Sequence, residues 1–197
     1  MDSSQLPTSP SVAAAVSAYR RHANVAALHE QLAIAAQSAT VEELIAAAEP
    51  FRDIPEVTGP LYERVVAAQP NNARALVILA SAYWMAGRGP EAVGELVARA
   101  LAADPQHQGA WHLWAITEAD PRDRVARWRQ VHKRFPSDDL ALAALADNAA
   151  SLAGAEHDPA ALRVALDAYL ELRRRAALPE QQTALDNAIS TLKNWKF

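Results

Sequence analysis

The sequence predicts an all-α fold, and two features of its composition support this prediction. Alanine makes up roughly a quarter of the 197 residues, and it is the residue that costs least to place in a helix. Glycine occurs six times, and the chain has no convincing run of alternating valine, isoleucine and threonine that would indicate a strand. A chain of this length is typical of one domain or a short repeat array.

The charge and the cysteine content exclude several classes of function. The formal net charge is −4 at pH 7, whereas general nucleic-acid binding requires a basic surface that releases counterions. The lack of cysteine excludes disulfides, thiolate catalysis and cysteine-ligated zinc. We therefore expect no nucleic-acid partner.

The N-terminal sequence and the apolar runs predict a cytoplasmic protein. Residues 1–10 are polar, contain two prolines, and predict a flexible lead-in without the basic and apolar regions of a secretory signal. The chain has no uninterrupted run of about 18 apolar residues, which a membrane-spanning helix would require. Sixteen arginines against three lysines favour a bacterial source with a GC-rich genome.

The first half of the chain predicts three successive helical segments. Apolar spacing over residues 11–38 predicts one long helix, within an N-terminal helical segment at 11–40. Thr40 with Glu43 has the pattern of a capping box and predicts the start of a new helix. Residues 41–52 and 54–69 then predict a helical hairpin.

Three prolines mark regularly spaced boundaries in the middle of the chain. Pro70, Pro105 and Pro136 each follow an apolar helical segment, at intervals of 35 and 31 residues. Because proline cannot continue the preceding helix, each one marks a helix-to-helix boundary. Residues 70–105 divide into two helical halves around residues 86–90, and small residues at Ala80 and Ala92 allow the two helices to approach closely. This segment therefore predicts a packed helical hairpin.

In this hairpin the chain resembles the tetratricopeptide repeat family. The residues that carry the resemblance are Leu76, Leu79, Ala80, Tyr83, Gly87, Ala92, Ala100 and Pro105, with one extra residue between Ala92 and Ala100. Residues 108–136 resemble a shortened copy, and a third copy begins near Ala141 and continues into an Arg-rich helix at 159–177. The resemblance covers residues 41–177 and is strongest at 73–105. It implies a short right-handed solenoid of antiparallel hairpins, with residues 178–197 as a C-terminal capping helix.

The same resemblance implies a ligand groove lined by the first helix of each hairpin. The residues at these places are Arg74, Val77, Ser81, Trp84 and Met85, then His112 and Ile116, and then Ala143, Asp147 and Ser151. Family members that clamp a terminal carboxylate carry lysines and asparagines there, whereas this face is mainly apolar. We expect the groove to bind an apolar or aromatic segment of another protein. In the alternative, Trp84 and Met85 pack under the N-terminal helix, which fills the groove from within the chain.

A basic helix is the second candidate surface. Its cations are Arg122, Arg124, Arg127, Arg129, Lys133 and Arg134, while Val125, Trp128, Val131 and Phe135 recur at the spacing of a buried face. Such a surface is usually solvated and ion-paired, here with Asp120, Asp123, Asp138 and Asp139 as available partners. The other interpretation is a patch for an acidic partner protein at Arg124, Arg127 and Arg134.

The sequence has no pattern of a catalytic or metal site. It lacks a Gly-rich phosphate loop, a Gly-x-Ser-x-Gly elbow and a zinc-protease pair of histidines. His22 and His29, two turns apart on the predicted first helix, offer only a weak surface metal site. We expect a scaffold, adaptor or assembly factor without enzyme activity, cofactor or metal. The alternative is a structural subunit that packs into a larger complex through its outer helical faces.

Overall fold

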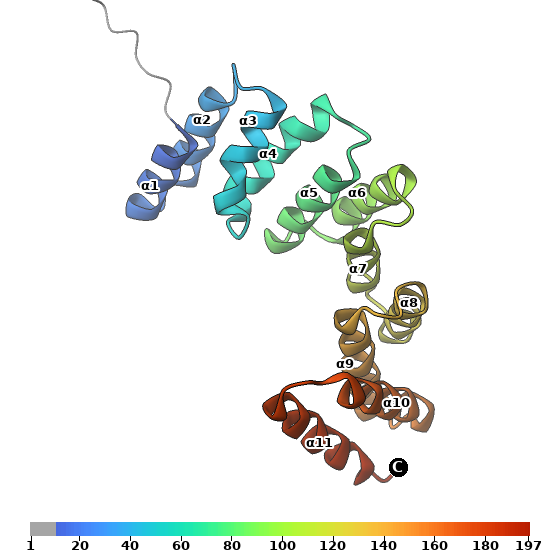
Figure 1. The fold of residues 1–197 in the computed structure, drawn as a ribbon. Helices are drawn as coiled ribbons and strands as arrows, with labels where there is room; N and C mark the ends of the chain where they lie inside the picture. The colour runs from blue at the N-terminus through green and yellow to red at the C-terminus, as the bar shows by residue number, and fades with distance from the viewer. Residues whose placement is uncertain (1–10) are drawn as a thin grey trace, which may run out of the picture. The chain divides into compact units, whose positions relative to one another are not determined.

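A computed structural model describes residues 11–197 as helices joined by short turns (Figure 1). Within these residues there is no β-strand, which confirms the all-α prediction. The lead-in predicted at residues 1–10 lies outside the described residues. None of the helices described is both long and apolar enough to cross a membrane.

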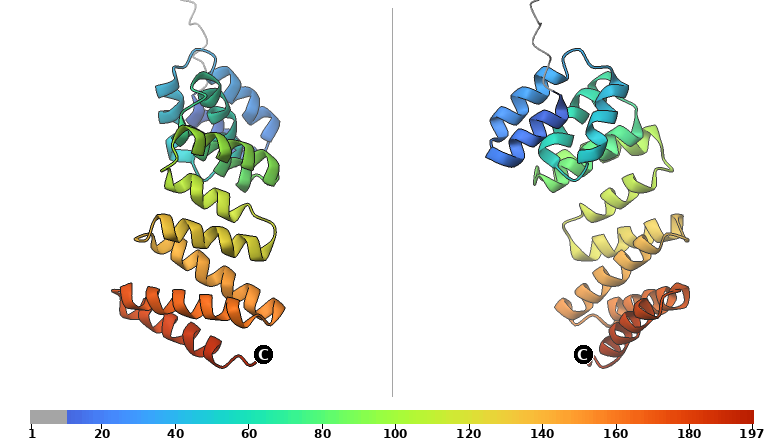
Figure 2. Two further views of the ribbon diagram at one scale, coloured as in Figure 1. Left: turned by 90° about the vertical axis from the view of Figure 1, so that its right-hand side faces the viewer. Right: turned by 60° about the vertical axis from the view of Figure 1, so that its left-hand side comes forward.

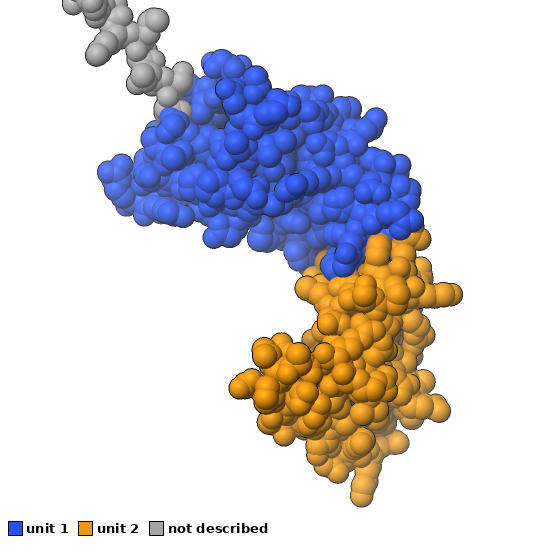
Figure 3. All heavy atoms as spheres, in the orientation of Figure 1, with its two compact units in different colours: residues 1–113 blue, residues 114–197 orange. Residues whose placement is uncertain are grey.

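The helices form two compact units, each of which has its own core. In both units the helices pack mainly against those before and after them in the sequence (Figures 1 and 2). Unit 1 ends at Leu113 and unit 2 begins at Trp114, so the boundary falls within α7 (Gln108–Ile116) (Figure 3). This serial packing confirms the predicted architecture of helical hairpins.

The helices of unit 1 begin where the local sequence supplies a cap or a proline. Thr40 and Glu43 form the predicted capping box, and Asn72 accepts a hydrogen bond from the backbone N–H of Ala75. Pro55 and Pro90 each occupy a first helical position, where proline loses no helical hydrogen bond. The elements before α7 are α1 (Val12–His22), α2 (Val25–Ala35), α3 (Val41–Ala48), the 3-10 helix η1 (Glu49–Phe51), α4 (Pro55–Ala68), α5 (Ala73–Met85) and α6 (Pro90–Ala103).

The prediction of one long helix over residues 11–38 is wrong, because the chain breaks between α1 and α2. Ala23 adopts a left-handed conformation with φ 51°, and the Asn24 side chain caps α2 by accepting from the N–H of Ala27. Apolar residues recur at helical spacing on both sides of the break, so this spacing did not indicate the change of direction. The five-residue step from Ala23 to Leu28 was the signal for it.

The predicted hairpin at residues 70–105 forms from α5 and α6, with one change in its core. Leu76 and Ala80 are fully buried, as expected. On α6, however, the fully buried residue is Val93, whereas Ala92 is only half-buried. Val93 stands one position later than Ala92 and therefore accounts for the extra residue before Ala100.

Three helices of unit 2, α8, α9 and α10, begin at an aspartate cap, whereas α11 begins at Pro179 without a side-chain cap. Asp120, Asp138 and Asp158 each accept backbone N–H groups from the first turn that follows. Val125 and Trp128 are buried, as the pattern of the basic helix predicted. After the end of α7, the helices are α8 (Pro121–Arg134), α9 (Asp139–Glu156), α10 (Pro159–Arg175) and α11 (Pro179–Lys193).

The C-terminal segment packs against the last hairpin of unit 2. Helix α11 lies along α10 and buries Ile189 and Leu192. Beyond α11, the Trp195 ring lies so close to Gly154 that a Cβ atom there would be 3.0 Å from it. This is the segment predicted to cap the array.

Candidate interaction surface

The first predicted surface is the α5 face, which we define as Arg74, Val77, Ser81, Trp84 and Met85. Its C-terminal end is apolar and open, since Trp84 is 40% exposed and Met85 51% exposed. Its middle is occupied by local contacts. The Ser81 hydroxyl donates to the Val77 carbonyl at 2.9 Å, and the Val77 side chain lies against Gly109 of α7. Trp84 and Met85 therefore carry the accessible apolar area of this face.

Helices α1 and α2 do not bury the open end of the α5 face. Helix α2 packs on α4, and α1 packs on α2 and α3. The exposure of Trp84 and Met85 contradicts the alternative in which the N-terminal helix covers them. An exposed tryptophan beside an exposed methionine is a common composition for a binding surface.

The remaining groove residues lie on α7 and α9. His112 is half-buried in unit 1, and Ile116 is 41% exposed in unit 2. On α9, Ala143 is half-buried and Ser151 is exposed. Asp147 accepts a hydrogen bond from the Tyr169 hydroxyl at 2.5 Å, which ties it to α10. That all ten residues line one groove stays a prediction.

Tyr83 lies at the centre of a polar cluster at the end of α5. Its hydroxyl donates to the Glu63 carboxylate at 2.8 Å, and the Arg88 guanidinium lies 4.4 Å from its ring centroid. Arg88 also pairs with Glu63 at 3.6 Å. Burial, and then the hydrogen bond to Glu63, raise the pKa of the Tyr83 hydroxyl above its usual range. Tyr83 therefore stays neutral, and the Glu63 carboxylate both accepts the Tyr83 hydrogen bond and pairs with Arg88.

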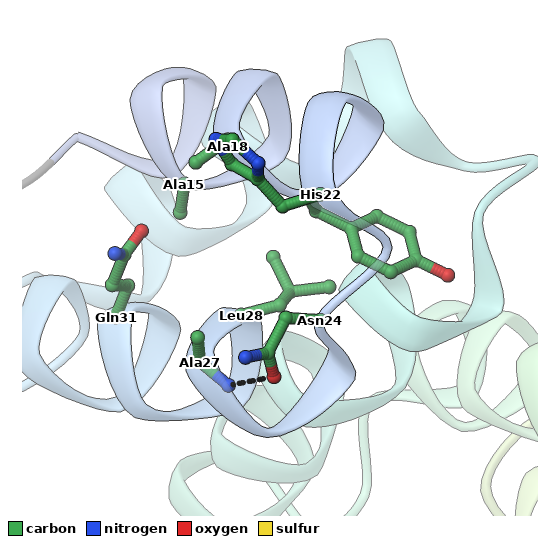
Figure 4. A pocket seen from close by; sticks show the side chains of 8 residues that line it. Ala15, Ala18, His22, Asn24, Ala27, Leu28 and Gln31 are labelled. Carbon is green, nitrogen blue, oxygen red and sulfur yellow. Dashed lines mark hydrogen bonds between the residues drawn. The ribbon is translucent and has the colours of Figure 1, made fainter.

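Unit 1 also contains cavities that sequence reasoning did not find, and two of them are lined by residues of α2. The first, of about 200 Å³, lies between α1 and α2 (Figure 4). Three alanines, Ala15, Ala18 and Ala27, are among its lining residues, and Asn24, which also lines it, already serves as a helix cap. Because no carboxylate, arginine or lysine side chain lines this cavity, we assign it no binding role.

The second cavity, of about 270 Å³, lies between α2, α4 and α5, and we call it the α2–α4–α5 cavity. Its lining residues are Val25 and His29 of α2, Pro55, Glu56, Gly59 and Pro60 of α4, Ala82 and Tyr83 of α5, and Ala86 and Arg88 of the turn after α5. The sequence signal for it was Gly59 followed by Pro60 inside a helical pattern, a pair that weakens a helix without ending this one.

The predicted basic patch consists mostly of side chains that bind within unit 2. Arg124 donates to the Asn148 side chain at 2.8 Å and to the Glu118 carbonyl at 3.0 Å. Arg127 pairs with the Glu118 carboxylate, and its guanidinium lies 4.7 Å from the Trp114 ring centroid. These contacts favour the solvated, ion-paired interpretation over an acidic-partner patch at Arg124 and Arg127.

The acids that pair with the basic helix differ in part from those predicted. Arg122 pairs with Glu156 and Asp158, while Asp120 caps α8 and Asp139 pairs with Arg175 at 2.9 Å. Arg134 is exposed, and it also interacts with another residue of the protein. Arg129 and Lys133 are exposed and make no ion pair within residues 11–197. A patch for an acidic partner stays a prediction.

The two histidines of the predicted weak metal site lie on different helices. His22 ends α1 and His29 lies in α2, so the interpretation that they share one helix face is wrong. Among residues 11–197, no three or more histidine, aspartate or glutamate side chains are grouped so that they could hold a metal ion.

Comparison with known proteins shows the fold of this chain but not its family. No family model matches the sequence, and no curated protein matches it. The crystal structure of MamA is similar, with a TM-score of 0.60 and 17% identity over 80% of this chain and 94% of that one. A structure of a Bacteroides ovatus ATCC 8483 protein, proposed to be protein-binding, covers 92% of this chain and 94% of its own at 15% identity, with a TM-score of 0.34. The likeness to MamA supports a tetratricopeptide-like helical repeat.

Proposed function

We propose that this chain is a protein-interaction scaffold that binds an apolar or aromatic segment of a partner protein on the α5 face. The observation that carries the proposal is the exposure of Trp84 and Met85 at the end of α5. Tryptophan is enriched among residues that dominate binding energy, and large apolar residues exposed together favour an interaction site. A helical-repeat fold supplies the rigid surface on which such residues act.

The chemistry of the α5 face favours an apolar ligand over a terminal carboxylate. Arg74 is the one cation of this face, and it lies at the opposite end of α5 from Trp84. A carboxylate clamp needs several converging donors, and Val77 and Ser81 supply none that is free. The proposal is one of binding without catalysis, in the cytoplasm.

Capture of the full-length chain from its own cells, with quantitative mass spectrometry, tests this proposal. Trp84→Glu places a charge in the apolar contact, and we expect it to lower the captured partner by about tenfold or more. Leu140→Glu is the matched control, because Leu140 is 60% exposed but lies in unit 2. Circular dichroism of both variants verifies that the helices persist. A partner retained equally by Trp84→Glu and wild type would overturn the proposal.

A structural subunit is the second candidate, favoured by apolar residues exposed in unit 2. Leu140, Leu178 and Phe197 are 60%, 55% and 43% exposed. If these residues pack permanently in a complex, Leu140→Glu lowers capture and Trp84→Glu does not. Partners would then co-purify at fixed stoichiometry, as an obligate interface requires.

A further inference from the structure

The α2–α4–α5 cavity has the size of a site for one side chain. Its volume is about 270 Å³, just below the range of about 300–1,000 Å³ typical of small-molecule sites. All of its walls belong to unit 1. Val25, Pro60 and Ala82 supply apolar surface to it, and Val25 is 40% exposed. A long aliphatic side chain could therefore enter from solvent and contact apolar walls.

Two residues in the middle of α4 create this space. Gly59 is buried, yet a Cβ atom added to it would meet nothing within 4 Å, so the volume beside it is empty. Pro60 has no N–H, which deprives the Glu56 carbonyl, four residues earlier, of its usual helical donor. Gly59 thus leaves open space in the cavity, and Pro60 leaves the Glu56 carbonyl without its helical donor.

The Glu56 side chain adds a second acceptor to the same wall. Its carboxylate is half-buried and makes no hydrogen bond or ion pair within residues 11–197. Arg88 also lines the cavity, but its guanidinium lies over the Tyr83 ring and pairs with Glu63 and not with Glu56. The Glu56 carboxylate is therefore available to accept hydrogen bonds from a ligand in the cavity.

The net charge of unit 1 is negative, like that of the Glu56 carboxylate. Residues 11–113 contain seven arginines, no lysine and ten aspartates or glutamates, which gives a net charge of −3. Unit 1 as a whole therefore attracts a cationic segment, while the cavity provides a specific place for one cation.

We propose that the α2–α4–α5 cavity binds a basic side chain, arginine in preference to lysine, of a partner polypeptide. Its aliphatic stem lies against Val25, Pro60 and Ala82, and its guanidinium donates to the carboxylate and carbonyl of Glu56. Arginine presents several donors in a planar fork and can serve both acceptors at once, whereas lysine is a point charge. The inference rests on the proposed function in that the partner is a protein, but it assigns a second site outside the α5 face.

Titration of the 15N-labelled full-length chain with N-acetyl-arginine amide, followed by NMR, tests the site directly. We expect shifts centred on the backbone amides of Gly59 and Ala82, and weaker or no shifts with the neutral probe N-acetyl-norleucine amide. Glu56→Gln should weaken arginine binding by about tenfold. Glu95→Gln is the matched control, because it removes the same charge from an exposed position on α6, and it should change binding by less than about twofold.

A second variant separates loss of the site from loss of charge. Gly59→Leu fills the cavity without changing the charge, and it should abolish the arginine-induced shifts. Equal weakening by Glu56→Gln and Glu95→Gln, or equal binding of the norleucine probe, would overturn the inference. Cellular capture distinguishes it from the proposed function. Loss of the partner with Trp84→Glu supports binding at the α5 face. Full retention of the same partner by Glu56→Gln and Gly59→Leu contradicts binding in the cavity.

Discussion

In unit 2 ion pairs join successive helices, whereas in unit 1 an apolar pair and a carboxylate stay open on the surface. Arg122 joins α8 to the α9–α10 turn, and Arg173 joins α10 to Asp186 of α11 at 2.8 Å. In unit 1, by contrast, Trp84 and Met85 are exposed and Glu56 has no partner within the described residues. Exposed ion pairs contribute little to stability, but the side chains that form them are less available to bind a partner.

The two units also use glycine differently. Gly154 of α9 is covered by the Trp195 ring, so its missing side chain serves packing. Gly59 of α4 faces empty space, so its missing side chain keeps a cavity open. At these two positions the packing therefore differs: the space beside Gly154 is filled, and the space beside Gly59 is open.

Core truncation in either unit should give the largest effect and test whether the units are separately stabilised. Leu142 of α9 and Leu76 of α5 are 1% and 0% exposed, so replacement of either by alanine should cost about 2–5 kcal/mol of unfolding free energy. Hydrogen exchange should show the larger loss of protection in the unit that carries the change. Equal loss across both units after Leu142→Ala would show that the division into units has no energetic basis.

The glycine contrast predicts opposite signs for two substitutions. Gly154→Val would place a branched side chain against Trp195, and overpacking of this kind typically costs about 1–3 kcal/mol. Gly59→Ala adds a methyl group in open space on a helix, where alanine is favoured over glycine by about 0.5–1 kcal/mol. Chemical denaturation of both variants measures the two signs. If Gly59→Ala destabilises the chain, the cavity is filled in solution and the contrast between the units is broken.

Alkaline pH should give the smallest effect, and it should reach both units. Burial and the Asp147 carboxylate raise the pKa of Tyr169 in unit 2, and burial and Glu63 raise that of Tyr83 in unit 1. Because the folded-state pKa lies above the unfolded value of about 10, stability is full below that pH and falls as the pH rises past it. Both side chains are partly solvated, so each contributes less than about 1 kcal/mol near pH ~11.

Thermal unfolding followed between about pH 9 and pH 11 checks this expectation. Tyr169→Phe and Tyr83→Phe should each make the melting temperature less dependent on pH, because phenylalanine cannot ionise. A variant that keeps the full wild-type slope would show that its tyrosine does not resist ionisation in the folded chain.

Much of the fold was predictable because its signals are local. Pro70, Pro105 and Pro136 lie in turns between helices, and the Thr40–Glu43 capping box forms as its spacing indicated. The break at Ala23 and Asn24 was missed because apolar residues continue on both sides of it, although asparagine is a preferred N-cap residue. The shift from Ala92 to Val93 was missed because both residues fit a helix interior.

The candidate sites were less predictable, because partners distant in the sequence decide which side chains are free. The sequence pattern predicted that both Trp84 and Arg127 lie on binding surfaces. In the structure Trp84 is exposed, whereas Arg127 pairs with Glu118 and donates a hydrogen bond to the Trp114 carbonyl. The α2–α4–α5 cavity had one local signal, Gly59 and Pro60 within a helix. Its other walls come from α2 and α5, which no local pattern connects to α4.

By itself, the sequence determined that this chain forms helical hairpins with an apolar core, since helix propensity, caps and apolar spacing act within a few residues. Only the tertiary structure decided which surfaces stay open. Burial and ion pairing depend on residues tens of positions apart, such as Arg122 with Asp158 or Glu63 with Tyr83, and these contacts exist only after the helices have packed.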